Sequence, residues 1–453
     1  MDTEHARAAV TQPARGPGRT DTAWTLGLAV LVGVIAATLA WARLPASARD
    51  TLWAEDSALF LQQRVEAGPL ATVFRPYDGY LHLVPRLMTD LATALPVEDY
   101  ARTVTALSCL VVGIVAALTV WFVAPIARHP MTRAAFALVP ALTPVVAFEV
   151  LGNSANVHSF LLYLVPVLLL VRPRTWRASV FPAVVAVVIG LSEIQALFFV
   201  PLLVLMVRRR RAWPIGFGLV AALAVQLLVN LTSGRVRTPV DQRLSDVVRG
   251  WFLEPVTSSF WPRASTAADH IAAHGWPLVL ALTVPFLFAA VLVLVGRWRR
   301  GDGLGPLRAL ALALLVGSPV VWGADLVLNP TPFIAFGEHG PTFIGQVGYL
   351  RYAAVPSMFL FGLLVLAAER VARVPRAGAR TVAVVGALAV LCFAAWRSEP
   401  YDVARSGAPT WTTEYLQAEQ HCTGGVAGDR LDQAPRSWGV ELSCDTIRSD
   451  DFP

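Results

Sequence analysis

Two adjacent carboxylates, Glu55 and Asp56, follow the first apolar run of the chain, residues 24–44. Trp53 precedes the pair and Phe60 follows it. A carboxylate beside an apolar surface can act as a general base that activates a hydroxyl, because partial burial raises its pKa. The pair would also suit a ligand for a metal ion or a sugar. The alternative is the start of an interfacial helix, where acidic residues are favourable.

A second cluster lies in residues 74–86, which are dense in groups that bind sugars and phosphates. Its candidate binding residues are Arg75, Tyr77, Asp78, Tyr80, His82 and Arg86. Arginine binds phosphate through paired hydrogen bonds, and aromatic faces stack on sugar rings. Tyr77-Asp78-Gly79 predicts a turn. The alternative is a turn followed by an interfacial helix whose Arg and Tyr side chains lie at the membrane surface.

Polar residues also interrupt two later apolar stretches. Asn153 and His158 stand at the end of one predicted span, and Glu193 and Gln195 stand at the next connection on the same side. Ionisable residues at membrane depth are expensive and therefore indicate function. Two neighbouring connections with such residues favour a cavity wall. The alternative is helix capping by Asn153 and Ser154.

Arg351 and Tyr352 begin a predicted span on its outer side. An outer arginine runs against the positive-inside trend, and a contact with a lipid phosphate would explain it. The alternative is an arginine that reaches to the interface without a ligand. His339, in the preceding connection, is a weaker candidate of the same type.

The composition indicates a membrane protein. The chain has 453 residues, of which 55% are hydrophobic and 15% charged, whereas soluble domains carry about a quarter charged residues. Apolar runs of spanning length predict an all-α polytopic membrane protein. All 37 basic residues are arginine, which suggests a GC-rich bacterial genome such as that of an actinomycete. Because arginine in cytoplasmic loops explains the basic charge, no nucleic-acid partner is expected.

Short arginine-rich connections set the predicted orientation. They are 125–133, 172–177, 208–213, 297–308 and 370–380. Placing them in the cytoplasm puts the N-terminus inside and the C-terminus outside. Eleven spans then follow, at 24–44, 102–124, 134–150, 158–171, 178–191, 196–207, 214–231, 276–296, 309–327, 351–368 and 381–396. The fourth to sixth are too short to cross about 30 Å as straight α-helices, so they are expected to extend further or to be partial helices around a cavity.

The long connections are all predicted to lie outside. Residues 1–23 are expected to be a disordered cytoplasmic tail, 24–396 the transmembrane domain, and 397–453 an extracytoplasmic tail. The outer loops are 45–101, which is expected to hold amphipathic interfacial helices, 232–275 and 328–350. Cys422 and Cys444 can pair as a disulfide if the tail lies outside the cell.

Many spans, a long first outer loop with Glu55-Asp56 directly after the first helix, and short partial helices resemble the GT-C superfamily of membrane glycosyltransferases. Within it, the chain looks most like actinobacterial enzymes that use polyprenyl-phosphate sugars. The resemblance implies a GT-C-like bundle and an inverting transfer of a sugar from a polyprenyl-phosphate donor to a cell-envelope glycan or glycolipid acceptor, on the outer face of the bacterial plasma membrane.

The same resemblance suggests roles for individual residues. Asp56 would be the base that deprotonates the acceptor hydroxyl, Glu55 its partner, and Arg351 the group that holds the donor phosphate. A divalent metal ion could sit at Glu55-Asp56, although two carboxylates do not specify one. Larger members of the family carry a C-terminal carbohydrate-binding domain. This chain has a short tail, which would form a small lid over the site if its two cysteines pair.

Two other functions compete with this interpretation. A lipid or sugar transporter or flippase of the cell envelope would line a path through the whole bundle with polar groups. The polar residues found here gather towards the outer side, which favours an enzyme. A scaffold without chemistry predicts that Asp56→Asn and Arg351→Ala would alter stability alone.

Overall fold

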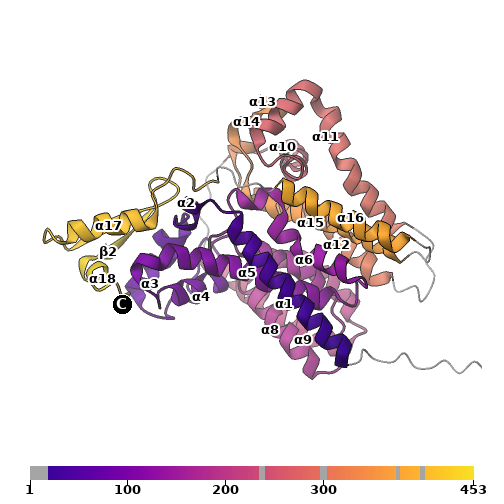
Figure 1. Ribbon diagram of the computed structural model, residues 1–453, viewed down its shortest axis with the longest axis horizontal. Coiled ribbons are helices and arrows are strands. Elements are labelled where there is room, and N and C mark those ends of the chain that lie inside the picture. The colour runs from indigo at the N-terminus through magenta and orange to yellow at the C-terminus, as the bar shows by residue number, and fades with distance from the viewer. Residues whose placement is uncertain (1–18, 234–239, 296–303, 374–377, 398–402) are drawn as a thin grey trace, which may run out of the picture.

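The computed structural model describes residues 19–233, 240–295, 304–373, 378–397 and 403–453 (Figure 1). It is mostly helical, which confirms the prediction of an all-α membrane protein. A two-stranded sheet near the C-terminus was not predicted. Most of the tail predicted at 1–23 lies outside the described residues, and the first helix begins at Arg19.

Helices labelled α are α-helices, and those labelled η are 3₁₀ or π helices. The first part of the chain forms α1 (Arg19–Ala42), α2 (Ala46–Arg49), η1 (Asp56–Leu61), α3 (Gln62–Ala67), α4 (Leu83–Ala92), η2 (Val97–Asp99) and α5 (Tyr100–Val123). The next part forms α6 (Pro130–Leu142), η3 (Pro144–Ala147), α7 (His158–Leu168), α8 (Arg177–Gly190), η4 (Ile194–Met206), η5 (Arg210–Ala212) and α9 (Trp213–Ser233).

The remaining elements follow the same pattern of long helices joined by short ones. They are α10 (Leu244–Trp251), η6 (Phe252–Val256), α11 (Ala264–Leu294), α12 (Gly305–Leu328), η7 (Pro332–Ile334), α13 (Phe336–His339), η8 (Pro341–Phe343), α14 (Ile344–Val347), η9 (Arg351–Ala353), α15 (Ala354–Ala372) and α16 (Ala379–Trp396). The C-terminal segment holds α17 (Trp411–Cys422), β1 (Gly428–Asp432), β2 (Gly439–Ser443) and α18 (Cys444–Ser449).

Within the described residues, seven helices are long and apolar enough to cross a membrane. They are Thr22–Ala42, Val97–Val123, Arg210–Ser233, Ala264–Leu294, Gly305–Leu328, Arg351–Ala372 and Ala379–Trp396. The shorter apolar helices α7, α8 and η4 coincide with the predicted fourth to sixth spans. The 13 residues of η4 form a 3₁₀ helix, whose rise of about 2 Å per residue lets it cover roughly 26 Å. The count of eleven spans stays a prediction.

Close backbone contact joins α1 to α5. A Cβ atom added at Gly33 would lie 2.9 Å from the carbonyl oxygen of Gly113, and one added at Gly113 would lie 2.7 Å from that of Gly33. Helices in membranes associate through such small residues, because dispersion contacts replace the hydrophobic effect there. This pair therefore fixes the helix that precedes the acidic residues.

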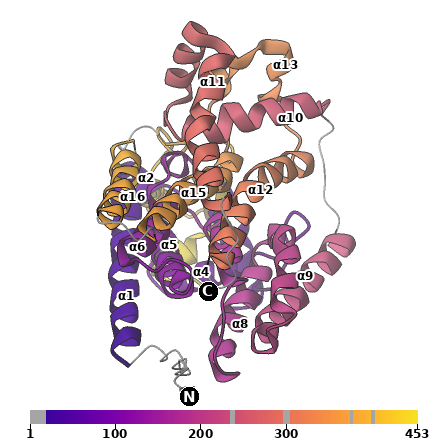
Figure 2. The same ribbon diagram turned by 90° about the vertical axis from the view of Figure 1, so that its right-hand side faces the viewer.

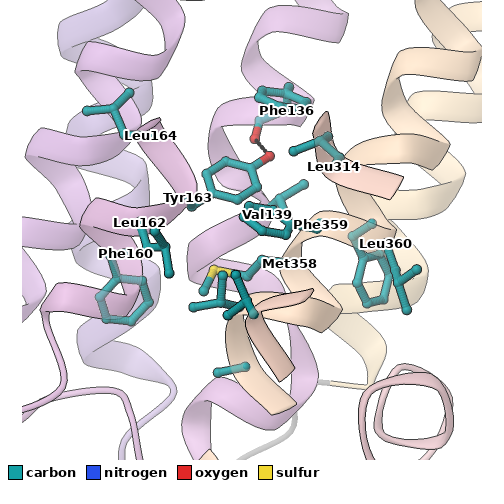
Figure 3. Close-up of a cluster of buried hydrophobic side chains, with 14 of the residues drawn as sticks. Phe136, Val139, Phe160, Leu162, Tyr163, Leu164, Leu314, Met358, Phe359 and Leu360 are labelled. Atoms are coloured by element: carbon teal, nitrogen blue, oxygen red, sulfur yellow. Dashed lines mark hydrogen bonds between the residues drawn. The ribbon is translucent and has the colours of Figure 1, made fainter. Parts of the chain in front are cut away.

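The centre of the bundle is packed with aromatic and aliphatic side chains (Figure 3). Phe136 of α6, Tyr163 of α7 and Phe359 of α15 are all fully buried. The Tyr163 hydroxyl donates to the Phe136 carbonyl at 2.9 Å. Figure 2 shows α1, α5 and α6 on one side of the bundle and α8 and α9 on the other, and α12 packs against α15. This core holds the helix ends that form the site.

The C-terminal segment packs against the first connection, beside α2 and α3 (Figure 1, yellow). Its strands β1 and β2 are antiparallel, and Cys422 forms the expected disulfide with Cys444. The buried Trp411 donates its indole N–H to the carbonyl of Val97 at 2.7 Å. The tail is thus a folded unit attached to the loop that carries the acidic pair.

Candidate functional site

A cavity of about 160 Å³ lies at one end of the bundle, where several helices begin or end. It is lined by Glu55, Phe60, Tyr77, Asp78, Tyr80, His82, Ala155, Asn156, His158, Ser159, Leu162, Glu193, Ile194, Gln195, Asp325, Leu328, Asn329, Arg351, Tyr352 and Val355. Most of the predicted site residues therefore share one cavity, although they come from distant parts of the sequence.

Glu55 faces this cavity. Its carboxylate oxygen Oε2 is buried and has no hydrogen-bond partner among the described residues. Burial, followed by the nearby charge of Glu55, raises the pKa of Tyr77 to about 12, so the tyrosine stays a neutral hydrogen-bond donor. Glu55 thus lines a polar cavity with a carboxylate, one oxygen of which accepts no hydrogen bond from the described residues.

Asp56 does not line the cavity and is 1% exposed. Its Oδ1 accepts the backbone N–H of Ser154 at 2.9 Å, the Ser154 hydroxyl at 2.6 Å and the N–H of Ala155 at 3.3 Å. Its Oδ2 accepts the N–H of Trp53 at 3.2 Å. Burial raises the pKa of Asp56 to about 6, against the lowering effect of these hydrogen bonds. The carboxylate is therefore mainly ionised at neutral pH and fastens the first connection to residues 153–156.

The two carboxylates do not converge on one point, because Asp56 binds Ser154 while Glu55 lines the cavity. Within the described residues, no group of three or more His, Cys, Asp or Glu side chains is placed to hold a metal ion. The residues of the pair therefore do not fit the divalent ion that was considered for them.

The segment behind Asp56 is held by the C-terminal tail. Arg405 donates to the carbonyl oxygens of Leu151 at 2.8 Å, Gly152 at 2.9 Å and Thr51 at 3.0 Å. Gly152 has φ 77, and an added Cβ would meet the Arg405 guanidinium at 2.8 Å.

Ala434, between β1 and β2, also attaches the tail to the first connection. It exchanges backbone hydrogen bonds with Leu52 and Ala54, and the neighbouring Gln433 bonds to Ser57 and to the carbonyl of Ala54. No described residue of 403–453 lines the cavity. The tail thus lies behind the acidic pair, and the expected lid over the site is not what the structure shows.

A tight turn delivers Tyr77, Asp78 and Tyr80 to the cavity. The backbones of Tyr77 and Tyr80 bond to each other at 3.0 and 3.1 Å, and Asp78 and Gly79 have φ of 48 and 83. Positive φ at both central positions defines a type I′ turn, which confirms the predicted turn. Gln226 of α9 then bonds to both backbone groups of Leu81, at 2.7 and 3.1 Å.

His82 lies at the cavity edge and is buried. Its Nε2 is 3.2 Å from the carbonyl oxygen of Tyr77, and its ring centroid lies 4.0 Å from that of Tyr80. Burial lowers the pKa of His82 to about 3. The imidazole is therefore neutral at physiological pH, and it supports the turn rather than carrying charge.

A chain of hydrogen bonds forms the opposite wall. The Nδ1 of His158 lies 2.5 Å from Oε2 of Glu193, and the other oxygen of Glu193 accepts the backbone N–H of Gln195 at 2.7 Å. The Gln195 side chain donates to Asp325 of α12. This chain joins α7, η4 and α12 and fixes the acidic groups around the cavity.

Arg351 is the single arginine among the described residues that line the cavity. Its Nη1 donates to Oε1 of Glu149 at 3.0 Å, and its guanidinium lies 5.3 Å from the ring centroid of Tyr352. A guanidinium carries five N–H donors. The bond to Glu149 uses part of this capacity and sets the orientation of the side chain.

Four predicted binding residues lie elsewhere. Arg75 is exposed and does not line the cavity. Arg86 is fully buried, with its guanidinium 4.9 Å from the ring centroid of Phe60. Asn153 caps its own turn by accepting the N–H of Asn156 at 2.9 Å. His339 is exposed and packs on Phe343. For Asn153, the structure therefore agrees with the alternative of helix capping.

Four polar lining residues were not predicted, namely Asn156, Ser159, Asp325 and Asn329. Asp325 had a signal in the sequence, because it is the one acidic residue of the predicted span 309–327 and an intramembrane acid indicates function. Asn329 and Ser159 resemble ordinary helix-end residues, and only the fold brings them to the cavity.

Comparisons with protein-family models, with curated proteins and with solved structures found no match to this chain.

Proposed function

We propose that this protein is an inverting glycosyltransferase that moves a sugar from a polyprenyl-phosphate donor to a cell-envelope glycan or glycolipid. The observation that carries the proposal is the carboxylate of Glu55, which lines a cavity rich in hydrogen-bonding groups and has a buried oxygen with no partner among the described residues. Carboxylates, amides and tyrosines around a small cavity suit the many hydroxyls of a sugar.

Glu55, rather than Asp56, is the better candidate for the base. The carboxylate of Asp56 already accepts hydrogen bonds from Trp53, Ser154 and Ala155 and has no access to the cavity. A general base needs hydrogen-bond reach to the proton that it removes. Glu55 lines the cavity in which an acceptor hydroxyl would bind, so in this proposal the two members of the pair exchange the roles that the family resemblance suggested.

The proposed reaction is a single displacement at the anomeric carbon of the donor sugar. Glu55 takes the proton of the acceptor hydroxyl while that oxygen bonds to the anomeric carbon of the donor sugar. The bond between this carbon and the phosphate oxygen breaks, and polyprenyl phosphate leaves with the electron pair. Attack opposite the leaving group inverts the anomeric configuration.

Arg351 is the candidate for holding the departing phosphate. It lines the cavity together with Glu55, and Glu149 fixes its orientation through the 3.0 Å bond. A guanidinium aimed at developing negative charge stabilises the transition state more than the ground state. The chain of His158, Glu193, Gln195 and Asp325 would orient the sugar hydroxyls.

The proposal places the cavity on the extracytoplasmic side of a bacterial plasma membrane. The positions of the arginine-rich connections support this orientation, with eleven spans, the N-terminus inside and the C-terminus outside. The disulfide between Cys422 and Cys444 supports it too, because such bonds persist in oxidising compartments. A lipid-linked donor needs no nucleotide site.

The test uses the purified chain in native membrane lipids with a set of radiolabelled polyprenyl-phosphate sugars. We expect the wild type to transfer at least one sugar and Glu55→Gln to be slower by about 10²- to 10⁴-fold, as for the loss of a general base. Glu66→Gln is the matched control, because Glu66 lies in the same loop, is exposed and bonds to Gln62.

Two outcomes would count against the proposal. Equal transfer by wild type and Glu55→Gln would remove Glu55 from the mechanism. An absence of transfer from every donor by a folded wild type would favour the transporter or flippase alternative.

A further inference from the structure

We propose that an apolar groove at the other end of the bundle binds one anionic phospholipid, with its phosphate at Arg172, Arg209 and Arg308 and an acyl chain along α12. The groove has a volume of about 700 Å³ and lies between η4, the start of α12 and the end of α11. This inference does not depend on the proposed function.

The groove is well separated from the cavity. It follows α12 from Gly305 to Val320, whereas Asp325 lies at the cavity. At 1.5 Å per residue, the start of α12 is roughly 30 Å from Asp325, about the thickness of the hydrocarbon core. The charged end of the groove therefore lies at the membrane surface opposite the candidate site.

The lining of the groove has two chemically distinct parts. Its walls are apolar and include Phe198, Leu205 and Leu312, each of which is exposed to the surroundings of the protein. Its end carries the three arginines, and none of the described lining residues is acidic. An apolar channel that ends in positive charge matches a lipid with an anionic headgroup.

Arg172 and Arg209 lie near enough to repel each other, and none of the described lining residues is acidic. Arg308 is 6% exposed, and the Nη1 atom of Arg209 is buried with no hydrogen-bond partner among the described residues. Burial, followed by repulsion from Arg172, lowers the pKa of Arg209. A phosphate at this position would bond to the buried nitrogen and relieve the repulsion.

The start of α12 adds to the positive potential. Gly305 and Pro306, the first residues of this 24-residue helix, line the groove. Leu304, the residue directly before the helix, has an apolar side chain that cannot cap the helix start, and Pro306 occupies one of the first positions. The N-terminus of a helix carries partial positive charge and exposed N–H groups, which favour a bound phosphate.

The test measures lipid retention by the purified full-length protein with native mass spectrometry in detergent. The probes are phosphatidylglycerol, phosphatidylcholine with the same acyl chains, and polyprenyl phosphate. We expect one phosphatidylglycerol to be retained in preference to phosphatidylcholine. The double variant Arg172→Gln/Arg209→Gln should weaken this binding by roughly 30-fold, the effect of two arginines near a phosphate.

The matched control is Arg174→Gln/Arg208→Gln. It removes the same charge from the same two connections at exposed residues that do not line the groove, and it should leave retention unchanged. Val316→Trp, which fills the groove at an exposed lining residue without changing charge, should also reduce retention.

Three results would overturn the inference. Retention of phosphatidylcholine equal to that of phosphatidylglycerol would show that the arginines do not select lipids by headgroup charge. Equal weakening by the control variant would show that overall charge, and not the groove, holds the lipid. Tighter binding of polyprenyl phosphate than phosphatidylglycerol through the same arginines would assign the groove to a prenyl lipid instead.

Discussion

Glu55 and Asp56 are neighbours in the chain, but they belong to two regions with opposite properties. On the cavity side, Glu55 has a buried oxygen without a partner in the described part of the chain, and its neighbours around the cavity are mostly polar. On the other side, Asp56 is enclosed by residues 153–156 and by the attached C-terminal segment, and both of its oxygens accept hydrogen bonds. A saturated carboxylate stabilises structure, whereas an unsaturated one is available for chemistry.

Glu55 and Asp56 have different surroundings because the backbone turns directly before them and points their side chains in different directions. Ala54 has φ 38, which turns the chain directly before the pair, and η1 begins at Asp56. Successive side chains at the start of a helix point in different directions around its axis. One carboxylate can therefore face the cavity while the next faces the protein interior.

Removing the carboxylate of Asp56 is expected to cause a large loss of stability. Asp56→Ala leaves the buried N–H and hydroxyl of Ser154 and the half-buried N–H of Ala155 without their acceptor, which should lower the free energy of unfolding by roughly 3 kcal/mol. The measurement is the denaturation temperature of the purified protein in one detergent. Unchanged stability would mean that Asp56 does not hold the two segments together. Glu66→Ala, at an exposed position of the same loop, is the control.

Removing the disulfide tests whether the C-terminal segment only stabilises the region around Asp56. The bond closes a separation of 22 residues, so Cys422→Ser/Cys444→Ser should cost about 3 kcal/mol in the chain-entropy model. We expect earlier unfolding and proteolysis of the tail, with transfer reduced in proportion to unfolding. Complete loss of transfer by a variant whose tail stays resistant to protease would contradict this, since it would give the tail a direct role at the cavity.

The pH dependence of the free energy of unfolding should also depend on Asp56, but this effect is expected to be smaller than the two losses of stability above. Its folded pKa, about 6, lies above the ordinary value of 3.8 because of burial. The folded state therefore binds the proton more tightly, and this contribution to stability is fully present below about pH 4 and is lost as the pH rises through about 6. Thermal denaturation between pH 4 and 7 should show a flatter decline for Asp56→Asn. Parallel curves for the two proteins would contradict the assignment.

Much of the cavity could be predicted from the sequence. Polar residues at the predicted outer ends of apolar runs, such as Glu193 and Arg351, do line it, because membrane crossing brings the ends of alternate helices to one face. The type I′ turn at Asp78-Gly79 could be predicted too, since these residues tolerate positive φ.

The features of the site that the sequence did not predict depend on side-chain direction and on contacts between residues far apart in the chain. Nothing local in the sequence indicates that Ser154 donates a hydrogen bond to Asp56, or that Arg405 reaches Gly152 across more than half of the chain. Arg86 matched a phosphate-binding residue by type, but the fold of α4 turns it against Phe60. Burial and direction, which decide such roles, are set by tertiary packing.

The most direct test of the divided acidic pair compares Glu55→Gln with Asp56→Asn in single-turnover transfer from a donor that the wild type uses. The amide of Asp56→Asn keeps one oxygen to accept from Ser154 and Ala155, so we expect near wild-type rates, and we expect Glu55→Gln to be slower by about 10²- to 10⁴-fold. Abolished transfer in a folded Asp56→Asn protein, together with normal rates in Glu55→Gln, would contradict the account and return the base to Asp56.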